Sequence, residues 1–368
     1  MFGERMQRVR ERMVEVGIDA LLLSLGADLP WLTGYTAMPL ERLTMLVLPA
    51  DGDATLVVPR LEAPRVVERP GVFEVLPWRE GDDPSAIVAG LVGSRSRLAI
   101  SDRAWSTFLL QLQRLVPGAS WTVGSAVTGP LRAVKDAAEI EALRVASAAA
   151  DRVATQLLAG AIPLIGRTEG EVSKDIGARL IAEGHAHVNF AIVGSGPNSA
   201  SPHHEPAGRV IGPCESVVCD FGGTWNATDG AGYCSDITRT VFTGEPPAEF
   251  VELYDVLEGA QAAAVAAAVV GARCEEVDDV ARGHITDGGF GDAFIHRTGH
   301  GIGLEEHEDP YIVSGNDVAL APGHAFSVEP GIYLAGRYGA RIEDIVVAAE
   351  GGPDALNHVD HRLHVVEA

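Results

Sequence analysis

The stretch FIHRTGHGIGLEEHEDP, residues 294–310, gathers three histidines and four acidic residues in seventeen positions, with glycine at 299, 301 and 303. Glycine at alternate positions disfavours a helix and lets another group approach the backbone closely. The stretch therefore predicts an extended or irregular segment that presents His300. We expect the glycines to admit a metal ion and a peptide.

Acidic residues also interrupt apolar segments elsewhere in this half of the chain. Asp220 ends the Val-Val-Cys run of SVVCDFGG, and Glu329 lies within FSVEPGIY. Glu343 and Asp344 lie within ARIEDIVVAA. Bare carboxylates on the buried face of a sheet are costly unless they are paired or bind a metal. Their number favours metal coordination.

One histidine among several carboxylates suits hard or borderline divalent ions such as Mn, Fe, Co or Zn. Four carboxylates exceed what one catalytic metal usually needs. Two ions about 3.5–4 Å apart, bridged by a carboxylate and a hydroxide nucleophile, use all of them. The pattern predicts a pair of divalent metal ions.

Ion pairing is the alternative for each acid taken singly. Asp236 lies close to Arg239 in the sequence, and Glu343 lies close to Arg341. Either arginine is able to neutralise its neighbour without a metal. Taken together, the repeated occurrence of acids in apolar segments and the presence of His300 favour the metal interpretation.

The first 125 residues or so predict a small α/β domain. Met6, Val9, Met13 and Val16 keep helical spacing and Gly17 follows, which indicates a helix over residues 4–16. Short apolar strands are expected at 20–24, 44–49, 54–59 and 97–101. Asp51-Gly52, between the second and third strands, is a strong hairpin-turn signal.

Near residue 130 a Gly/Pro/Ser/Thr-rich stretch leads into a long alanine-rich helix, so we divide the chain into domains 1–130 and 131–368. Asp136 and Glu139 have the spacing of a capping box at the start of that helix. Further helices are expected at 169–183, 247–271 and 275–286, and strands at 215–223, 235–242, 325–334 and 340–349. The second domain is therefore predicted to be α+β.

The net charge and the N-terminal sequence argue against several classes of protein. The chain has 368 residues, 28 basic and 51 acidic, and a net charge of −23. Such a charge opposes binding to nucleic acid or to anionic membranes. The N-terminus has no apolar segment typical of a signal peptide, which predicts a cytoplasmic protein.

The site residues resemble the five-ligand set of the pita-bread metallopeptidases, with Asp220, Asp236, His300, Glu329 and Glu343 at the matching positions. The forms HGIGLEEHEDP and VEPGIY are most similar to Xaa-Pro aminopeptidases and Xaa-Pro dipeptidases (prolidases). GIDALLL and WLTGY resemble the creatinase/prolidase N-terminal domain. The resemblance implies an α+β fold, in which a smaller α/β domain precedes a C-terminal creatinase/aminopeptidase-like pita-bread domain.

The resemblance also implies a role for each matching residue. Asp220 binds one metal, Asp236 and Glu343 bridge the two, and His300 and Glu329 complete the second site. Glu329 also shuttles the proton, and His307 stabilises the tetrahedral intermediate. His203 and His296 line the substrate pocket. Arg341 and Tyr333 orient ligands close to the substrate.

The implied function is that of a dinuclear exopeptidase that hydrolyses Xaa-Pro bonds through a metal-bridging hydroxide. Manganese is the first expectation for the metals, with Co, Zn and Fe as alternatives, and small proline-containing peptides and a homodimer are the expected partners. Dipeptidase and aminopeptidase activity both stay open. The rivals are a hydrolase of this fold with a non-prolyl substrate and a non-catalytic peptide-binding or protein-binding module.

One feature departs from the family pattern, and one pocket position has two candidate histidines. Asp220 and Asp236 are sixteen residues apart where the family has eleven, so we expect an enlarged hairpin loop around NATDG, residues 226–230. Loops tolerate insertions of this size at modest entropic cost. SPHHEP offers both His203 and His204 for the pocket, and we prefer His203.

Overall fold

The computed structural model describes residues 1–227 and 232–366. The chain forms two compact units, which meet in the sequence between Arg132 and Ala133. Each unit has its own sheet or sheets and its own apolar core.

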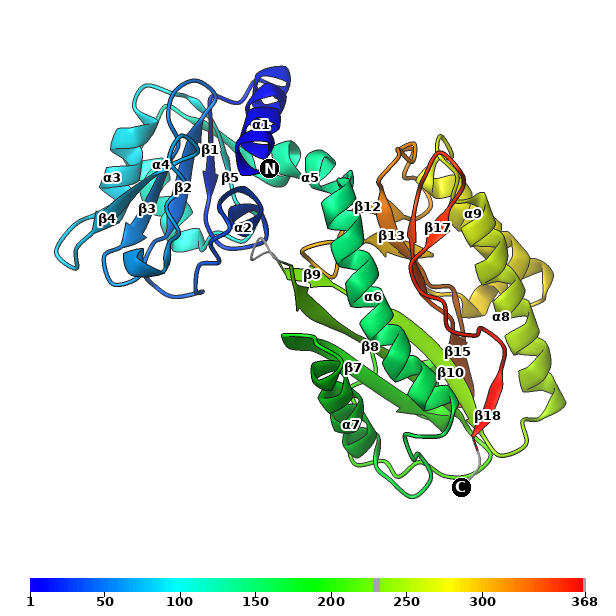
Figure 1. Cartoon of the computed structure of the whole chain (residues 1–368). Coiled ribbons are helices and arrows are strands. Elements are labelled where there is room, and N and C mark those ends of the chain that lie inside the picture. The colour runs from blue at the N-terminus through cyan, green and yellow to red at the C-terminus, as the bar shows by residue number, and fades with distance from the viewer. Residues whose placement is uncertain (228–231, 367–368) are drawn as a thin grey trace. The chain divides into compact units, whose positions relative to one another are not determined.

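The N-terminal unit is built on a six-stranded mixed sheet in the order β4-β3-β2-β1-β5-β6 (Figure 1). Its elements are α1 (Phe2–Val16), β1 (Ala20–Leu23), α2 (Asp28–Thr33), β2 (Met45–Pro49), β3 (Thr55–Pro59), β4 (Glu74–Trp78), α3 (Pro84–Val92), β5 (Arg97–Ile100), α4 (Ser106–Leu115), β6 (Ser120–Val123) and α5 (Ser125–Ala133). The first predicted helix, the four strands and the β2–β3 hairpin are confirmed. Gly17 ends α1 at φ 73°, a left-handed conformation that favours glycine.

The C-terminal unit contains three sheets, in the orders β18-β10-β8-β7, β12-β11-β13-β16-β17 and β14-β15, with β9 paired to β8. Its elements are α6 (Ala137–Leu158), α7 (Glu169–Ala182), β7 (His187–Ser195), β8 (Ser216–Asn226), β9 (Gly232–Cys234), β10 (Ile237–Thr243), α8 (Ala248–Ala267), α9 (Cys274–Asp287), β11 (Gly299–Gly301), β12 (Glu308–Ile312), β13 (Ala325–Val328), β14 (Gly331–Leu334), β15 (Tyr338–Arg341), β16 (Asp344–Val347), β17 (Asp354–Ala355) and β18 (His364–Val366). The predicted helices are confirmed to within a few residues at their ends. Asp136 and Glu139 form the expected capping box.

Helices cover the sheets of the C-terminal unit in two groups (Figure 1). Apolar side chains of α6 and α7 pack with those of β7, β8 and β10 in one core. Those of α8 and α9 pack with β13 and β16 in another. The strands that carry the predicted ligands are therefore held between two packed layers.

The prediction of single strands at 325–334 and 340–349 was wrong, because each segment forms two strands. The first breaks at Glu329-Pro330, between β13 and β14, and the second breaks at Ile342-Glu343, between β15 and β16. At both breaks the chain passes from the two-stranded sheet to the five-stranded one or back. Glu329 and Glu343 therefore lie between strands, whereas Asp220 lies within β8.

Neighbouring backbone approaches Gly299 and Gly301 closely on the side where a Cβ would lie, and the approach of a metal ion or a peptide to this segment stays a prediction. A Cβ at Gly299 would lie 1.8 Å from the carbonyl oxygen of Ser327, and one at Gly301 would lie 2.2 Å from that of Asp309. Glycine is required here because β12 and β13 flank β11 tightly. The effect is to pack His300 firmly between two strands.

The hairpin between Asp220 and Asp236 keeps one register throughout. Asp220 pairs with Thr238, and farther along the same ladder Thr224 pairs with Cys234 and Asn226 with Gly232. The expected enlargement therefore extends the paired strands without shifting them. Of the residues around NATDG, Thr228, Asp229 and Gly230 lie outside the described residues.

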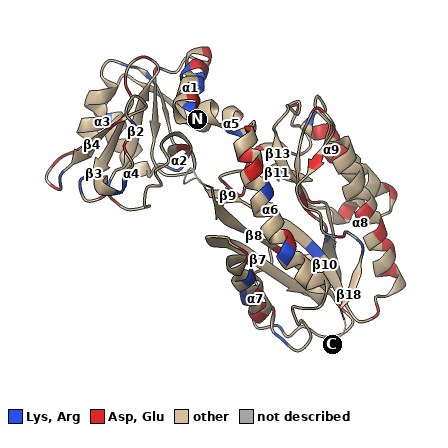
Figure 2. Ribbon diagram, viewed as in Figure 1, with Lys and Arg blue, Asp and Glu red and all other residues tan. Residues whose placement is uncertain are grey.

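Acidic residues are spread along α8 and α9, as Figure 2 shows. They contribute to the net charge of −23. Among the helices of the described ranges, none has the length and apolar character to cross a membrane.

Candidate metal centre

All five predicted metal ligands line one cavity of about 480 Å³ in the C-terminal unit. The five residues lie in separate strands or at strand ends. Asp220 lies in β8, Asp236 precedes β10, His300 lies in β11, and Glu329 and Glu343 occupy the two sheet crossings. The fold thus brings together residues that are up to 123 positions apart in the sequence (343 − 220).

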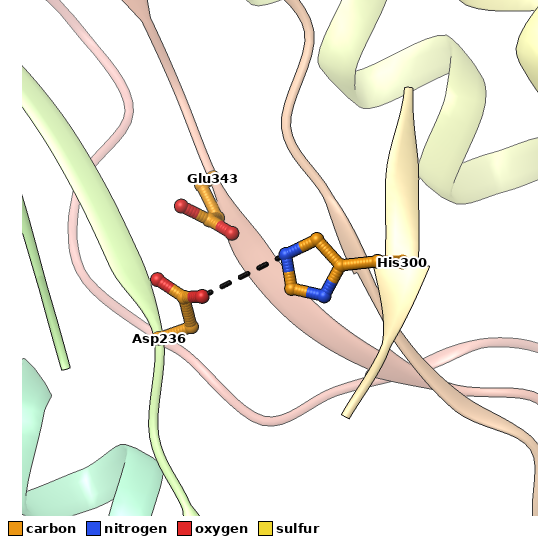
Figure 3. A group of neighbouring side chains, drawn as sticks. All are labelled: Asp236, His300 and Glu343. Atoms are coloured by element: carbon orange, nitrogen blue, oxygen red, sulfur yellow. Dashed lines mark ion pairs between the residues drawn. The ribbon is translucent and has the colours of Figure 1, made fainter. Parts of the chain in front are cut away.

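Asp236, His300 and Glu343 form the centre of this cluster (Figure 3). One ligand atom of each lies within 4.8 Å of the others, and all three residues are buried. His300 Nε2 is 3.8 Å from Asp236 Oδ2 and 3.2 Å from Glu329 Oε1. His300 Nδ1 donates to the carbonyl oxygen of Gly301 at 3.1 Å, which turns Nε2 toward the acids.

Three carboxylate oxygens in this cluster are buried without a hydrogen-bond partner. They are Oδ1 of Asp220, Oδ1 of Asp236 and Oε1 of Glu343. Buried polar atoms are nearly always satisfied, and charged ones are costly when they are not. Oxygen donors with one imidazole nitrogen are the ligands that divalent cations take in such sites. The residues present therefore fit divalent metal ions.

Crowding of like charges perturbs the acids of the centre. Burial, together with the nearby carboxylates, holds the pKa values of Asp236 and Glu343 well above their usual range. Burial acts in the same direction on Glu329, but its hydrogen bond with His300 and the electrostatic attraction of His300, His296 and Arg341 together outweigh burial and lower the pKa of that carboxyl. Without cations the cluster holds more negative charge than its surroundings neutralise.

Within the described part of the chain, neither Arg239 nor Arg341 forms an ion pair with Asp236 or Glu343. Arg239 pairs at 2.8 Å with Asp344, which also accepts from His361 at 2.6 Å. Burial opposes ionisation of Asp344, but Arg239 and His361 hold its pKa below the usual value. The pKa of Glu343 is therefore raised, whereas that of the adjacent Asp344 is lowered.

Arg341 connects Asp220 with other groups around the cavity. It donates to Asp220 Oδ2 at 2.5 Å, to Thr238 Oγ1 at 3.0 Å and to the Tyr333 hydroxyl at 2.9 Å. It also donates to the carbonyl oxygen of Pro202 at 3.2 Å. Thr238 in turn donates to Glu343 Oε2 at 2.7 Å. One buried guanidinium therefore orders ligands from two strands.

His203, His296 and His307 all line the cavity, as predicted. His307 lies against His300 with ring centroids 4.1 Å apart. His204 instead contacts Glu169, with Nε2 2.8 Å from Oε2. This arrangement favours His203 over His204 as the pocket histidine.

Tyr333 is not among the lining residues and lies behind His296 and Arg341. His296 Nδ1 donates to the carbonyl oxygen of Arg297 at 2.7 Å, so its Nε2 accepts from the Tyr333 hydroxyl at 2.9 Å. Burial lowers the pKa of His296 and raises that of Tyr333 to about 12, so both groups are neutral near pH 7. Tyr333 therefore fixes the orientation of the His296 ring.

We expect Tyr333→Phe to lower peptidase kcat/KM roughly tenfold, in line with the loss of a net hydrogen bond of about 1–1.5 kcal/mol. The change removes the only proton that the structure offers to His296 Nε2 among the described residues. Steady-state kinetics at several substrate concentrations measure the effect. Tyr338→Phe, at a hydroxyl that contacts exposed Arg337 and Glu249 and does not line the cavity, is the matched control. Equal effects of the two changes would contradict the assignment.

Sequence reasoning missed five further lining residues, namely Phe190, Ile192, Pro202, Arg297 and Glu306. Phe190 and Ile192 lie two apart on β7, which was not predicted. The alternation of large apolar residues at 188, 190 and 192 in HVNFAIVGS is the available signal for that strand. Arg297 and Glu306 carry no pattern that distinguishes them from surface charges.

Comparisons with known proteins agree with this architecture. Residues 140–350 match metallopeptidase family M24, and residues 5–134 match the creatinase/prolidase N-terminal domain. The crystal structure of dipeptidase PepE from Mycobacterium ulcerans is 42% identical in sequence and covers 100% of this chain and 98% of its own, with a TM-score of 0.93. Prolidase from Thermococcus sibiricus is 35% identical and covers 100% and 99%, with a TM-score of 0.92. The Xaa-Pro dipeptidase of Lactobacillus helveticus is 35% identical over 98% of both chains. The predicted fold class is thereby confirmed.

Proposed function

The chain belongs to metallopeptidase family M24, and on that premise we propose that it is a dinuclear Xaa-Pro dipeptidase. Membership makes it a metal-dependent peptidase that acts on peptides. The number of metal ions, the prolyl preference and the roles of individual residues are the parts that we propose.

The observation that carries the proposal is the set of three unpartnered, buried carboxylate oxygens that surround His300 in one cavity. A single cation would leave part of a set of four carboxylates and one imidazole unused. Asp220, Asp236, His300, Glu329 and Glu343 would hold two divalent ions. When bound, such ions generate a nucleophile from water near neutral pH and polarise the scissile carbonyl.

The chain's own residues then handle the proton and the developing charge. Glu329 is ionised, because its contact with His300 lowers its pKa, so it can accept a proton and pass it to the leaving amine. His307 and His203 face the cavity and can donate hydrogen bonds to the oxyanion. His296, held by Tyr333, lines the side that receives the proline ring.

The relatives support a dipeptidase over an aminopeptidase. The Mycobacterium ulcerans structure is named a dipeptidase, and the Lactobacillus helveticus and Thermococcus sibiricus proteins are named Xaa-Pro dipeptidase and prolidase. Proline substrates are a distinct class because an Xaa-Pro bond has no N–H for a protease to bind. Manganese as the metal, a homodimer, a cytoplasmic location and domains 1–130 and 131–368 complete the proposal.

We expect the metal-loaded protein to hydrolyse Ala-Pro, with little cleavage of Ala-Pro-Ala or Ala-Ala. Stripping the metal with a chelator should abolish hydrolysis, and adding Mn²⁺ back should restore it. Metal analysis should give two ions per chain in wild type. Asp220→Ala should lose metal and activity, whereas Asp287→Asn, at the exposed end of α9, should not.

Each peptide separates one rival. Cleavage of Ala-Pro-Ala would identify an aminopeptidase, and cleavage of Ala-Ala a non-prolyl dipeptidase. A folded, metal-loaded protein that cuts none of the three would remove the prolyl assignment.

A further inference from the structure

Two buried carboxylates outside the metal centre lie on two helices and have similar hydrogen-bond partners. Glu169 lies in the first turn of α7 and Asp278 lies in α9, and both are fully buried. Glu169 Oε1 accepts from Ser195 N at 2.8 Å and Ser195 Oγ at 2.7 Å. Asp278 Oδ1 accepts from Thr298 N at 3.0 Å and Thr298 Oγ1 at 2.8 Å. Each acid thus accepts hydrogen bonds from both the backbone N–H and the side-chain hydroxyl of one residue.

The residues held in this way border the two segments that carry the cavity histidines. Ser195 is the last residue of β7, and the chain continues from it toward His203. Thr298 follows His296 and immediately precedes β11. We call Glu169 and Asp278 the anchor carboxylates.

Glu169 also holds the His203 loop directly. Asn198 Nδ2 lies 3.1 Å from each of its oxygens, and His204 Nε2 donates to Oε2 at 2.8 Å. On the other side of His203, the carbonyl oxygen of Pro202 accepts from Arg341. His203 therefore lies between two residues with fixed partners, and it faces the cavity.

Asp278 is connected to the segment that carries His296 through the side chain of Arg282. Arg282 donates to the two oxygens of Asp278 at 3.0 Å each. The same guanidinium donates to the carbonyl oxygens of Phe294 at 3.1 Å and His296 at 2.9 Å. The backbone on both sides of the His296 ring is therefore fixed to α9.

We propose that the anchor carboxylates are positioning residues, Glu169 for His203 and Asp278 for His296, and that each acts on its own histidine. The proposal rests on the proposed function, because it takes the two histidines as substrate-contacting groups. A carboxylate is needed at both places, since each acid accepts at least four hydrogen bonds and donates none. An amide would turn an N–H₂ toward these donors and leave some of them unpaired.

Crossed double-mutant cycles test whether each anchor acts on one histidine. We expect Glu169→Gln and Asp278→Asn each to lower kcat/KM on Ala-Pro roughly 10–100-fold, the cost of a misplaced catalytic geometry. In a His203→Ala background, Glu169→Gln should change kcat/KM by less than about twofold, whereas in a His296→Ala background it should keep its full effect. Asp278→Asn should show the opposite pattern. Asp279→Asn, at the exposed neighbour of Asp278, is the matched control.

Conservative replacement separates the hydrogen bond from general packing. His204→Gln keeps an N–H donor for Glu169 and should retain most of the activity, whereas His204→Leu should resemble Glu169→Gln. If Glu169→Gln lowers activity by the same factor in both histidine backgrounds, the anchors only stabilise the fold and the proposal is overturned.

Amide hydrogen exchange on metal-loaded protein tests the proposal without turnover. Glu169→Gln should speed exchange in residues 196–204 and leave 294–301 unchanged, and Asp278→Asn should do the reverse. Exchange that rises in both segments, or in neither, would overturn the proposal. If wild type cuts no Xaa-Pro peptide but the exchange pattern is as expected, the proposed function fails and the positional assignment stands.

Discussion

Replacing Asp236 by asparagine is expected to raise the free energy of unfolding of the metal-free protein while it removes the peptidase activity. Asp236 is buried beside three other carboxylates, and its Oδ1 has no hydrogen-bond partner. Removing one charge relieves that repulsion, by about 1–2 kcal/mol, which is typical of single substitutions. Activity should fall by more than about 10³-fold, because even one lost electrostatic contact at a reacting centre costs about 10²–10³-fold.

The stabilisation by Asp236→Asn should depend on pH with a definite sign. Burial and neighbouring acids raise the folded-state pKa of Asp236 above its unfolded value of about 3.9. Stability linked to such a group is fully present below the unfolded pKa and is lost as the pH rises through the folded pKa. The advantage of the variant should therefore be largest near neutral pH and should shrink as the pH falls toward about 4.

Metal should reverse the order of stability. A ligand that binds only the folded state stabilises it by about 2.7 kcal/mol at one hundred times its Kd. Wild type should gain this stability from Mn²⁺, and Asp236→Asn should gain much less. Urea unfolding of both proteins, with chelator and with Mn²⁺, measures all four values, and Asp279→Asn serves as the exposed control. A variant that is less stable than wild type in both conditions would show that Asp236 is an ordinary paired acid.

Four of the five candidate ligand positions were predicted from a distinctive local context, and Asp236 was added by the family resemblance. His300 lies among glycines, Asp220 and Glu329 end mostly apolar segments, and Glu343 lies just before the apolar run IVVAA, where an acid is costly. The strand breaks at Glu329 and Glu343 could not be predicted in the same way. An apolar run that crosses from one sheet to another has the same pattern as one long strand, because both partners are supplied by distant segments.

The groups that orient the ligands were harder to predict, because their roles depend on contacts between segments far apart in the sequence. Arg341 and Asp220 are 121 residues apart, and their pairing appears only in the folded chain. Glu169 has a helix N-terminal position that any solvated acid also favours. Only its complete burial and its set of donors distinguish it. Local patterns and the family resemblance therefore predict the candidate ligands together with Arg341 and Tyr333, whereas the anchoring contacts of Glu169 and Asp278 emerge only from the tertiary structure.

Arg341→Met is expected to destabilise the metal-free protein by about 3–5 kcal/mol, the cost of removing one partner from a buried ion pair. Arg341 is almost fully buried, and its loss would leave the Asp220 carboxylate without its neutralising charge. Pro202 and Tyr333 would lose their donor as well. Arg341→Lys should recover part of the stability, because an ammonium supplies the charge but not the planar fork that reaches several acceptors.

The loss caused by Arg341→Met should be clearly smaller in the metal-loaded protein, because a cation bound to Asp220 replaces the missing positive charge. Urea unfolding of wild type, Arg341→Met and Arg341→Lys, each with chelator and with Mn²⁺, provides the comparison. Arg337→Met, which breaks an exposed pair with Glu249, should cost less than about 1 kcal/mol in both conditions. A loss that is equal with and without metal would mean that no cation shares the Asp220 carboxylate with Arg341. The guanidinium would then be the sole neutralising partner of Asp220, and the dinuclear assignment would lose one of its five ligands.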